Sequence, residues 1–294
     1  MNRGQDTLKK FKKIYLEITN TCGAACSFCP GTVRAPAFMA WDDFRDVIKK
    51  IKGRADYLAF HLMGEPLLHP DLPLFIDIAG ENGFKVNLAS NGRHILAAEP
   101  LLEKEALRQV SFSLHSAADM ESAQVEEYLG RIFEFTDRAL KGDRVHVSFR
   151  LWSIDRGDNT GRMLKMIKER YNKELDTTPA ETHVKGVKVR GKLFLHMAKE
   201  FEWPDLKNRD YGKRGFCLGL REQAGILADF TVVPCCLDRD GVMALGNIKE
   251  KTWEEILSGQ RAKNIYDGFS RREAVEELCR RCGYRQRFES AKKN

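Results

Sequence analysis

The stretch TCGAACSFCP, residues 21–30, brings Cys22, Cys26 and Cys29 together within eight residues. Short fixed gaps let thiolates converge on one centre from a single loop, as the ligands of metals and iron–sulfur clusters do. Three such ligands suit a four-iron cluster whose fourth iron stays open, and an open position at a metal takes substrate or cofactor. A zinc site would need a fourth protein ligand, and the closest histidine is His61.

The cysteine loop lies within an alternation of strands and helices. Ile14–Thr19 has the pattern of a strand that leads into the loop, and Trp41–Ile51 has the apolar spacing of a helix. Repeated βα units imply a parallel sheet with right-handed crossovers. Six units are too few for a closed eight-stranded barrel, so we expect an α/β fold with a partial (β/α)6 TIM-like barrel over residues 1–200. The later strands are expected at Tyr57–Met63, Phe84–Ser90, Gln109–His115, Arg144–Trp152 and Val187–His196, and the later helices at Leu72–Glu81, Ala97–Leu107, Ser122–Leu140 and Arg162–Tyr171.

Chemically active side chains follow the ends of these strands. Gly64–Pro66 comes after the second strand and Ser90–Gly92 after the third. Ser113 and His115 end the fourth strand, and Arg150 lies near the end of the fifth. Because active sites of βα folds lie at the carboxyl ends of the strands, we expect these groups on one rim with the cysteine loop.

The pattern changes after Phe201, and we expect a small α+β domain over residues 201–294. A hairpin of Gly225–Asp229 and Thr231–Cys235 is followed by helices around Thr252–Leu257 and Arg272–Arg280. So small a core favours a metal centre that holds it together.

The remaining thiols of this second part are sufficient for a closed site. By spacing alone, four thiolates fit a four-iron cluster or a structural zinc equally well. One of the adjacent pair is spare, because consecutive side chains on a strand point to opposite faces. These thiols are Cys217, Cys235, Cys236, Cys279 and Cys282.

Composition excludes several classes of protein. A hydrophobic fraction of 43% excludes a disordered chain, and a net charge of +7 falls short of a dedicated nucleic-acid binder. No apolar run is long enough for a transmembrane helix, and the N-terminal stretch lacks a secretory signal, so we expect a cytoplasmic protein without disulfides. Basic residues gather at both ends, and we interpret them as solvated: Lys9, Lys10, Lys12 and Lys13, then Arg271, Arg272, Arg280, Arg281, Arg285 and Arg287.

The three-cysteine motif, with Phe28 before its last cysteine and a strand before the loop, resembles the radical S-adenosylmethionine (radical SAM) superfamily. The resemblance implies that Cys22, Cys26 and Cys29 hold a [4Fe-4S] cluster whose open iron binds the amino and carboxylate groups of SAM. Met63–Pro66 looks like the GGEP motif of that family, with Met63 in place of the first glycine. The implied SAM contacts are Gly64 and Glu65 for the ammonium, Ser113 and Arg150 for the carboxylate, Ser90 and Asn91 for ribose or methionine, and Phe28 for adenine.

The second part resembles the SPASM domain in its shortened form, the twitch domain, through residues 216–236 and the Cys279–Cys282 turn. That resemblance implies one auxiliary [4Fe-4S] cluster held by Cys217, Cys235, Cys279 and Cys282, with Cys236 as the alternative to Cys235. A second auxiliary site is not expected, because no cysteine follows Cys282.

The resemblance also implies a reaction. An electron, supplied by a donor such as flavodoxin or ferredoxin, cleaves SAM to a 5′-deoxyadenosyl radical, which abstracts hydrogen from an unidentified substrate. An auxiliary cluster with four cysteine ligands would accept the remaining electron, giving net oxidation or modification of a peptide or protein side chain or a small polar metabolite. The alternatives are RNA or nucleotide modification by the same chemistry, and a non-enzymatic zinc-stabilised binding module. His115, Asp229 and Asp238 are the candidates for a general base.

Overall fold

A computed structural model describes residues 10–152, 157–176 and 185–288. The strands form one sheet in the order β10-β9-β8-β1-β2-β3-β4-β5-β7-β6. Within it, the consecutive strands from β1 to β5 and then β7 are parallel to one another. The expected partial barrel of βα units is confirmed. The strands are β1 (Phe11–Leu16), β2 (Ala55–Ala59), β3 (Lys85–Ser90), β4 (Leu107–Ser113), β5 (His146–Leu151), β6 (Lys185–Arg190), β7 (Leu193–Met197), β8 (Gln223–Ile226), β9 (Thr231–Val233) and β10 (Gly246–Asn247).

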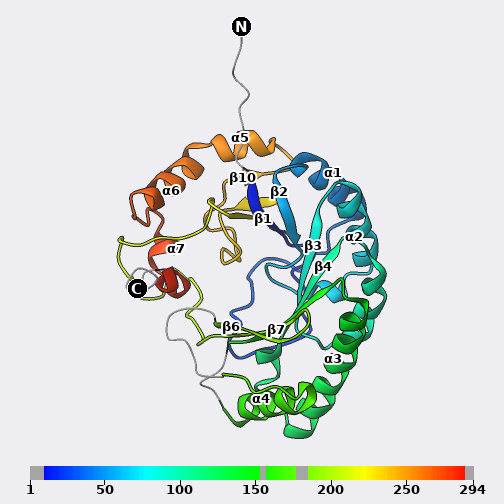
Figure 1. Cartoon of the computed structure of the whole chain (residues 1–294). Coiled ribbons are helices and arrows are strands. Elements are labelled where there is room, and N and C mark those ends of the chain that lie inside the picture. Colours follow the sequence, from blue (N-terminus) through cyan, green and yellow to red (C-terminus); the bar gives the residue numbers. More distant parts are fainter. Residues whose placement is uncertain (1–9, 153–156, 177–184, 289–294) are drawn as a thin grey trace.

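Helices cover the outer side of the curved sheet. Figure 1 shows α1, α2 and α3 along that side, with the orange α5 beside α1 and with α6 and the red α7 across the molecule from α2 and α3. The α-helices are α1 (Trp41–Ile51), α2 (Leu72–Glu81), α3 (Ser122–Gly142), α4 (Gly157–Tyr171), α5 (Trp253–Ser258), α6 (Gln260–Ser270) and α7 (Glu277–Arg280). The 3₁₀ helices are η1 (Pro66–Leu68), η2 (Ile95–Glu103), η3 (Leu114–Ala117) and η4 (Gly283–Phe288).

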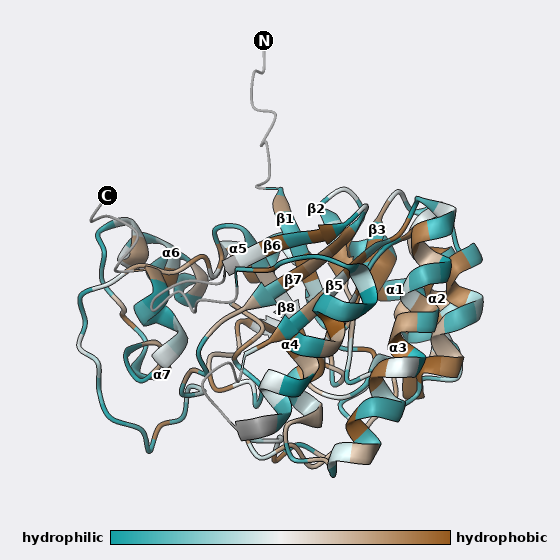
Figure 2. Ribbon diagram, turned by 60° about the horizontal axis from the view of Figure 1, so that its bottom comes forward, coloured by the Kyte–Doolittle hydropathy of each residue, from teal (hydrophilic) through white to brown (hydrophobic). Residues whose placement is uncertain are grey.

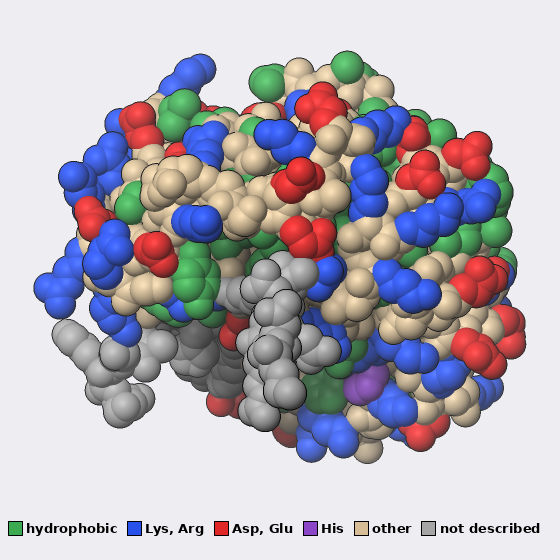
Figure 3. Space-filling model, turned by 90° about the horizontal axis from the view of Figure 1, so that it is seen from above, with side chains coloured by type: hydrophobic (Ala, Val, Ile, Leu, Met, Phe, Trp, Pro, Cys, Tyr) green, Lys and Arg blue, Asp and Glu red, His purple; other side chains and the backbone are tan. Residues whose placement is uncertain are grey.

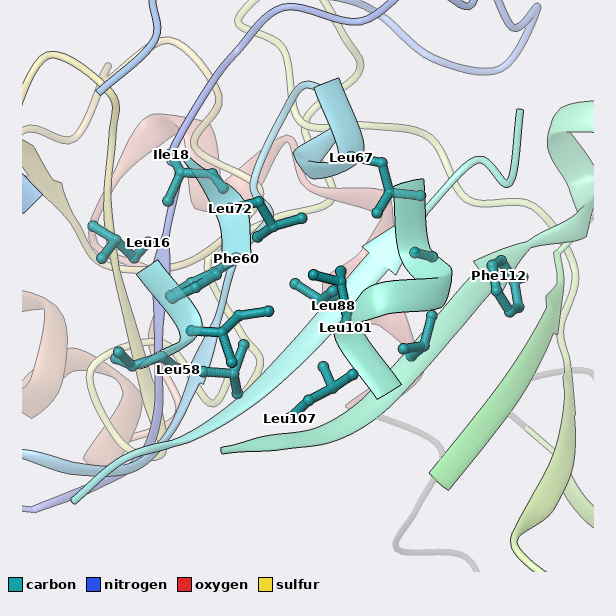
Figure 4. Packing of buried hydrophobic residues seen from close by; sticks show 14 of the residues in the cluster. Leu16, Ile18, Leu58, Phe60, Leu67, Leu72, Leu88, Leu101, Leu107 and Phe112 are labelled. Atoms are coloured by element: carbon teal, nitrogen blue, oxygen red, sulfur yellow. The ribbon is translucent and has the colours of Figure 1, made fainter. Parts of the chain in front are cut away.

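Alternation along the strands separates an apolar face from a polar one. Ile14, Leu16, Leu58 and Leu88 are fully buried against the helices, where Figure 4 shows several of them converging. Figure 2 shows helices α1 to α3 with hydrophobic and hydrophilic stretches alternating along their length, as helices packed on one side require. The alternate residues of the same strands face into the barrel and are largely polar. The barrel interior is therefore available for a site.

The prediction of a single strand at Val187–His196 is wrong in one respect, because the segment forms a hairpin of two strands, β6 and β7. Strand β7 pairs parallel with β5, whereas β6 returns antiparallel on its outer side. Gly191 has φ of +50° at the turn between them, a conformation that glycine adopts without strain.

Two of the expected helices also differ. The segment expected as a helix at Ala97–Leu107 is the 3₁₀ helix η2, which contains Pro100 and ends before β4 begins. Proline lacks the N–H that an α-helix would need there. The expected helix Arg272–Arg280 is reduced to α7, since Glu273 pairs with Arg214 in an isolated β-bridge and the N–H of Ala274 donates to the carbonyl of Lys213.

The sheet continues into the second part of the chain. Strand β8 pairs parallel with β1, and β9 and β10 follow antiparallel. An open barrel leaves the edge of β1 unpaired, and a strand from the C-terminal part covers that edge. The two parts of the chain thus share one sheet. No helix in the described ranges is long and apolar enough to cross a membrane.

Candidate active site

A cavity of about 1140 Å³ occupies the barrel interior and extends to the C-terminal part. Its volume exceeds the roughly 300–1,000 Å³ of ordinary small-ligand pockets. All seven residues expected to contact SAM line it, and so does His115. All eight cysteines of the chain border this one cavity: Cys22, Cys26, Cys29, Cys217, Cys235, Cys236, Cys279 and Cys282.

The first cysteine group lies on the loop after β1. The N–H of Cys29 donates to the carbonyl of Cys26 over 3.0 Å, which folds the loop back on itself. Burial, followed by the neighbouring thiols of Cys29 and Cys22, raises the pKa of Cys26 to about 11. The three sulfur atoms are therefore electrostatic neighbours in the lining of the cavity.

A buried ion pair that the sequence analysis missed fixes this loop. Glu17, at the end of β1, is fully buried, and both its oxygens accept from Arg34 over 2.7 Å. The same carboxylate accepts the backbone N–H of Met63 (3.0 Å) and of Ala228 (2.9 Å). Glu17 therefore joins the cysteine loop, the loop after β2 and the C-terminal hairpin. A carboxylate inside an apolar strand was the signal that could have identified it.

Gly64 lets the loop after β2 pass close to the end of β1. Its φ is +73°, and a Cβ at this position would lie 2.3 Å from the carbonyl oxygen of Thr19. Any other residue would meet both a left-handed backbone and a backbone atom. The glycine of the family-like motif is therefore required by packing in this chain.

Glu65 follows in a buried position at the rim. Its carboxylate accepts the N–H of Leu67 over 3.0 Å and that of Asn91 over 2.6 Å. Burial raises the pKa of Glu65. The two N–H groups and the hydroxyl of Ser90 lower the same pKa, but the effect of burial is larger. Each carboxylate oxygen has two lone pairs, so both can accept a further donor from the cavity.

Asn91 connects the ends of β2 and β3 with the cysteine loop. Its side-chain amide lies 3.6 Å from the sulfur of Cys22. Its carbonyl accepts the hydroxyls of Tyr128 (2.8 Å) and Ser116 (3.1 Å), which fixes the backbone from two sides. Ser90 is buried and accepts the N–H of Gly92 over 2.9 Å.

An aromatic stack borders the opposite part of the rim. The rings of Phe28 and His115 meet edge to face with centroids 4.5 Å apart, and Trp152 stacks on His115 at 5.4 Å. Burial lowers the pKa of His115 to about 4, so its ring is neutral near pH 7. The ring nitrogen Nδ1 lies 3.1 Å from the carbonyl oxygen of Arg150. Ser113 and Arg150 are paired residues on β4 and β5 beside this stack.

The thiols of the C-terminal part are electrostatic neighbours. Burial raises the pKa of Cys235, and the next causes are its neighbours Cys217, Cys236 and Cys279. The pKa of Cys282 is raised to about 12 by burial and by Cys217. Burial also raises the pKa of Cys236, which Lys13, Tyr15 and Arg150 of the barrel lower. Cys235 thus neighbours Cys217 and Cys279, whereas Cys236 has neighbours both in the barrel and among the thiols.

The donor set fits iron–sulfur clusters. Among the described residues, no three His, Cys, Asp or Glu side chains converge on a point that one metal ion could occupy. In a cluster, iron and sulfide atoms stand between the thiolates, so the ligands need not meet at one point. Every sulfur in both groups would be held as a thiolate by the metal, which offsets the cost that burial imposes on the bare anions.

Two of the candidate bases lie away from the cavity. Asp238 is fully buried and accepts the N–H groups of Val242 and Met243, each over 2.8 Å, so it holds a turn. Asp229 is exposed at the tip of the β8–β9 hairpin and accepts the N–H of Thr231. Of the three candidates, His115 alone lines the cavity.

Two basic residues that we interpreted as solvated are placed inside. Arg285 is 1% exposed and donates to the carbonyls of Cys279 (3.0 Å), Arg214 (2.6 Å) and Gly212 (2.8 Å), which clamps the chain around the Cys279–Cys282 turn. Lys13 lines the cavity because strand alternation places it on the same face as Tyr15.

Family comparisons agree with these features. The model of the radical SAM superfamily matches residues 16–144, and that of SPASM, an iron–sulfur cluster-binding domain, matches residues 217–283. A curated protein of Selenomonas ruminantium, an S-adenosylmethionine-dependent nucleotide dehydratase, is 30% identical over 86 residues, which are 29% of this chain and 31% of that protein. The alignment therefore spans about a third of this curated relative.

Solved structures share the fold at low identity. BtrN in complex with AdoMet and 2-DOIA has a TM-score of 0.55 at 16% identity, covering 94% of both chains. The structure of anSMEcpe with bound AdoMet and Kp18Cys peptide has a TM-score of 0.57 at 13% identity, and the alignment covers 93% of this chain and 89% of that one. Streptococcus suis SuiB bound to precursor peptide SuiA has a TM-score of 0.52 at 12% identity, and the alignment covers 95% of this chain and 71% of that one. The alternative of a zinc-stabilised binding module is wrong, because the cysteine-rich part matches a domain that binds iron–sulfur clusters.

Proposed function

Because this chain belongs to the radical SAM superfamily and carries an iron–sulfur cluster-binding SPASM domain, we propose that it is an oxidising or modifying enzyme whose substrate binds inside the barrel. Its family uses a [4Fe-4S] cluster and SAM, and SPASM domains bind further clusters. The observation that carries the proposal is the single cavity bordered by both groups of thiols. A reaction begun at one group and completed at the other needs such a shared space.

Cys22, Cys26 and Cys29 would hold the first cluster, and Glu65 and Arg150 would bind the ammonium and the carboxylate of SAM. A carboxylate suits an ammonium, and the guanidinium fork can bind a carboxylate through two hydrogen bonds. When bound, these cofactors supply a 5′-deoxyadenosyl radical that removes a hydrogen atom from the substrate. Asn91 and Ser90 support the site from β3, and Ser113 adds a hydroxyl beside Arg150.

The residues around the rim would protect and orient the reacting groups. Phe28, His115 and Trp152 form a continuous aromatic wall, which would pack near adenine and exclude water. The polar interior below the rim would hold the substrate with its target C–H bond in reach. At pH 7 the neutral ring of His115 has one nitrogen engaged with the Arg150 carbonyl.

Cys217, Cys235, Cys279 and Cys282 would hold the auxiliary cluster, with Cys236 outside the ligand set. Four cysteine ligands leave no open coordination position, which favours electron transfer over direct binding of substrate. The net result would be oxidation of a peptide or protein side chain or of a small polar metabolite. A reducing partner such as flavodoxin or ferredoxin would supply the first electron, and eight free cysteines suit the reducing cytoplasm.

Nucleotide modification is the second candidate. The curated relative is named for a nucleotide substrate, and the cavity contains basic side chains without acidic partners. RNA is less favoured, because Figure 3 shows Lys and Arg side chains dispersed among Asp and Glu over the face drawn there. RNA binding would weaken steeply with added salt, whereas a nucleotide held in a cavity would respond less.

The central experiment measures iron, sulfide and SAM cleavage on anaerobically reconstituted protein. We expect about eight iron atoms per chain, four for each cluster, and formation of 5′-deoxyadenosine after reduction. Cys26→Ala should abolish cleavage, with the exposed Lys85→Met as the matched control. Cleavage retained in Cys26→Ala, or zinc without sulfide in the wild type, would overturn the proposal.

A further inference from the structure

Two half-buried cations that line the cavity have neither an ion pair nor a side-chain hydrogen bond to a described residue. Lys13 on β1 and Arg150 on β5 both line the cavity, and no ion pair or side-chain hydrogen bond is found for either within the described residues. Burial and the charge of Arg150 lower the pKa of Lys13, and burial followed by the charges of Arg150 and Lys13 lowers the pKa of His61. Two like charges in a confined space cost free energy unless an anion joins them.

The groups around these cations do not supply that anion. Among the described residues, the acidic ones that line the cavity are Glu65 and Glu222. Glu65 is bound at the rim, and Glu222 is exposed and affects the pKa of Lys13 less than Cys236, Arg150 and Lys12 do. Tyr15, whose ring centre is 4.8 Å from the Lys13 ammonium, has a raised pKa and is neutral near pH 7. The thiol of Cys236 also faces Lys13, beside the hydroxyl of Tyr15.

Further polar atoms in the same space find no partner in the described parts of the chain. His61 Nδ1 and Trp152 Nε1 are buried without a hydrogen bond to any of these residues, and both residues line the cavity. The ring of His61 meets Tyr15 edge to face at 5.2 Å, so this nitrogen belongs to the same chamber as Lys13. Buried polar groups are normally satisfied, and a cavity with several unsatisfied ones is matched to a ligand that completes them.

We propose that the substrate carries an acidic group, a carboxylate or a phosphate, which binds Lys13 in the chamber between β1, β2 and β5. This rests on the proposed function, in which Arg150 binds the carboxylate of SAM and leaves Lys13 to the substrate. Tyr15 and His61 flank the ammonium and supply neutral hydrogen-bonding groups to the same oxyanion. The substrate class is thus an acidic metabolite, an acidic peptide segment or a nucleotide, and the oxyanion is the feature they share.

The test uses the full chain with both clusters and saturating SAM, and measures the midpoint of thermal unfolding. Inorganic phosphate and succinate are compared with chloride at constant ionic strength. We expect one of the two to raise the wild-type midpoint by about 2–4 °C at ten times its dissociation constant. Lys13→Met should lose this rise and should unfold in chloride no earlier than the wild type, because it removes a half-buried charge that has no ion pair among the described residues.

Lys85→Met, on the exposed start of β3, is the matched control and should keep the wild-type response. It also accounts for the general stabilisation that phosphate gives by exclusion from protein surfaces.

A response to phosphate alone assigns a phosphate-bearing substrate, and a response to succinate alone assigns a substrate with a carboxylate. A rise that persists in Lys13→Met, or no rise in the wild type, overturns the inference. Formation of 5′-deoxyadenosine by the wild type is measured separately, and its absence would count against the proposed function and leave the anion result standing.

Discussion

Arg34 and Glu17 form a two-pronged ion pair in which each terminal guanidinium nitrogen lies 2.7 Å from one carboxylate oxygen. Glu17 is fully buried, and the side chain of Arg34 is 11% exposed. Arg34 follows the cysteine loop and also donates to the carbonyl of Arg239 over 2.8 Å. Thr32 and the N–H of Val33 bind Asp240 in the same turn. The pair therefore connects the first cysteine group to the C-terminal part through the core.

We expect Glu17→Gln to lower the free energy of unfolding by about 3–5 kcal/mol, because it leaves a buried guanidinium without its counter-charge. The measurement is anaerobic thermal unfolding, compared with the exposed pair Lys10–Asp56, whose side chains are 55% and 49% exposed. Asp56→Asn should cost less than about 1 kcal/mol. Equal effects of the two substitutions would contradict this role for Glu17.

Gly64→Ala should abolish SAM cleavage and destabilise the protein by more than the roughly 1–2 kcal/mol of a left-handed alanine. The added Cβ would meet the Thr19 carbonyl, which is backbone and cannot move aside. Gly83→Ala is the control, since its φ is +85° and no atom lies within 4 Å of the new Cβ. Assays of 5′-deoxyadenosine and of the unfolding midpoint check both effects, and normal cleavage by Gly64→Ala would show that the loop can shift.

Cys235→Ala should reduce the iron content from about eight to about four atoms per chain, whereas Cys236→Ala should retain all of it. The reason is that Cys235 faces Cys217 and Cys279, and Cys236 faces Lys13 and Tyr15. Iron and sulfide analysis of the two variants after the same anaerobic reconstitution provides the measurement. Loss of iron in Cys236→Ala with none in Cys235→Ala would reverse the assignment.

Stability should depend on pH through His115. Its folded pKa is lowered to about 4 from 6.5, so between these values the unfolded chain binds the proton and the folded chain does not. The stabilisation is present above pH 6.5 and is lost as pH falls, by about 1.3 kcal/mol between pH 7.5 and 5.5. His115→Gln should lose stability less steeply over this interval. Identical slopes in anaerobic unfolding experiments would show that the folded ring is protonated.

Much of this site followed from local sequence signals. The Cys22–Cys29 spacing, the loop of Gly64 and Glu65 after a strand, and helices such as Trp41–Ile51 and Leu72–Glu81 depend on residues close in the chain. The hairpin of β6 and β7 was missed because a single glycine at φ +50° interrupts an otherwise continuous strand pattern.

The sequence by itself determined which chemistry is present, since fixed cysteine gaps and strand-end residues are set by a few neighbouring positions. Only the tertiary structure decided how these groups combine. The pairing of β8 with β1 brings both groups of thiols to one cavity, and the fold buries Glu17 and places the half-buried Lys13 in the cavity lining. Such relations join residues far apart in the chain, and no local pattern encodes the long-range packing that brings them together.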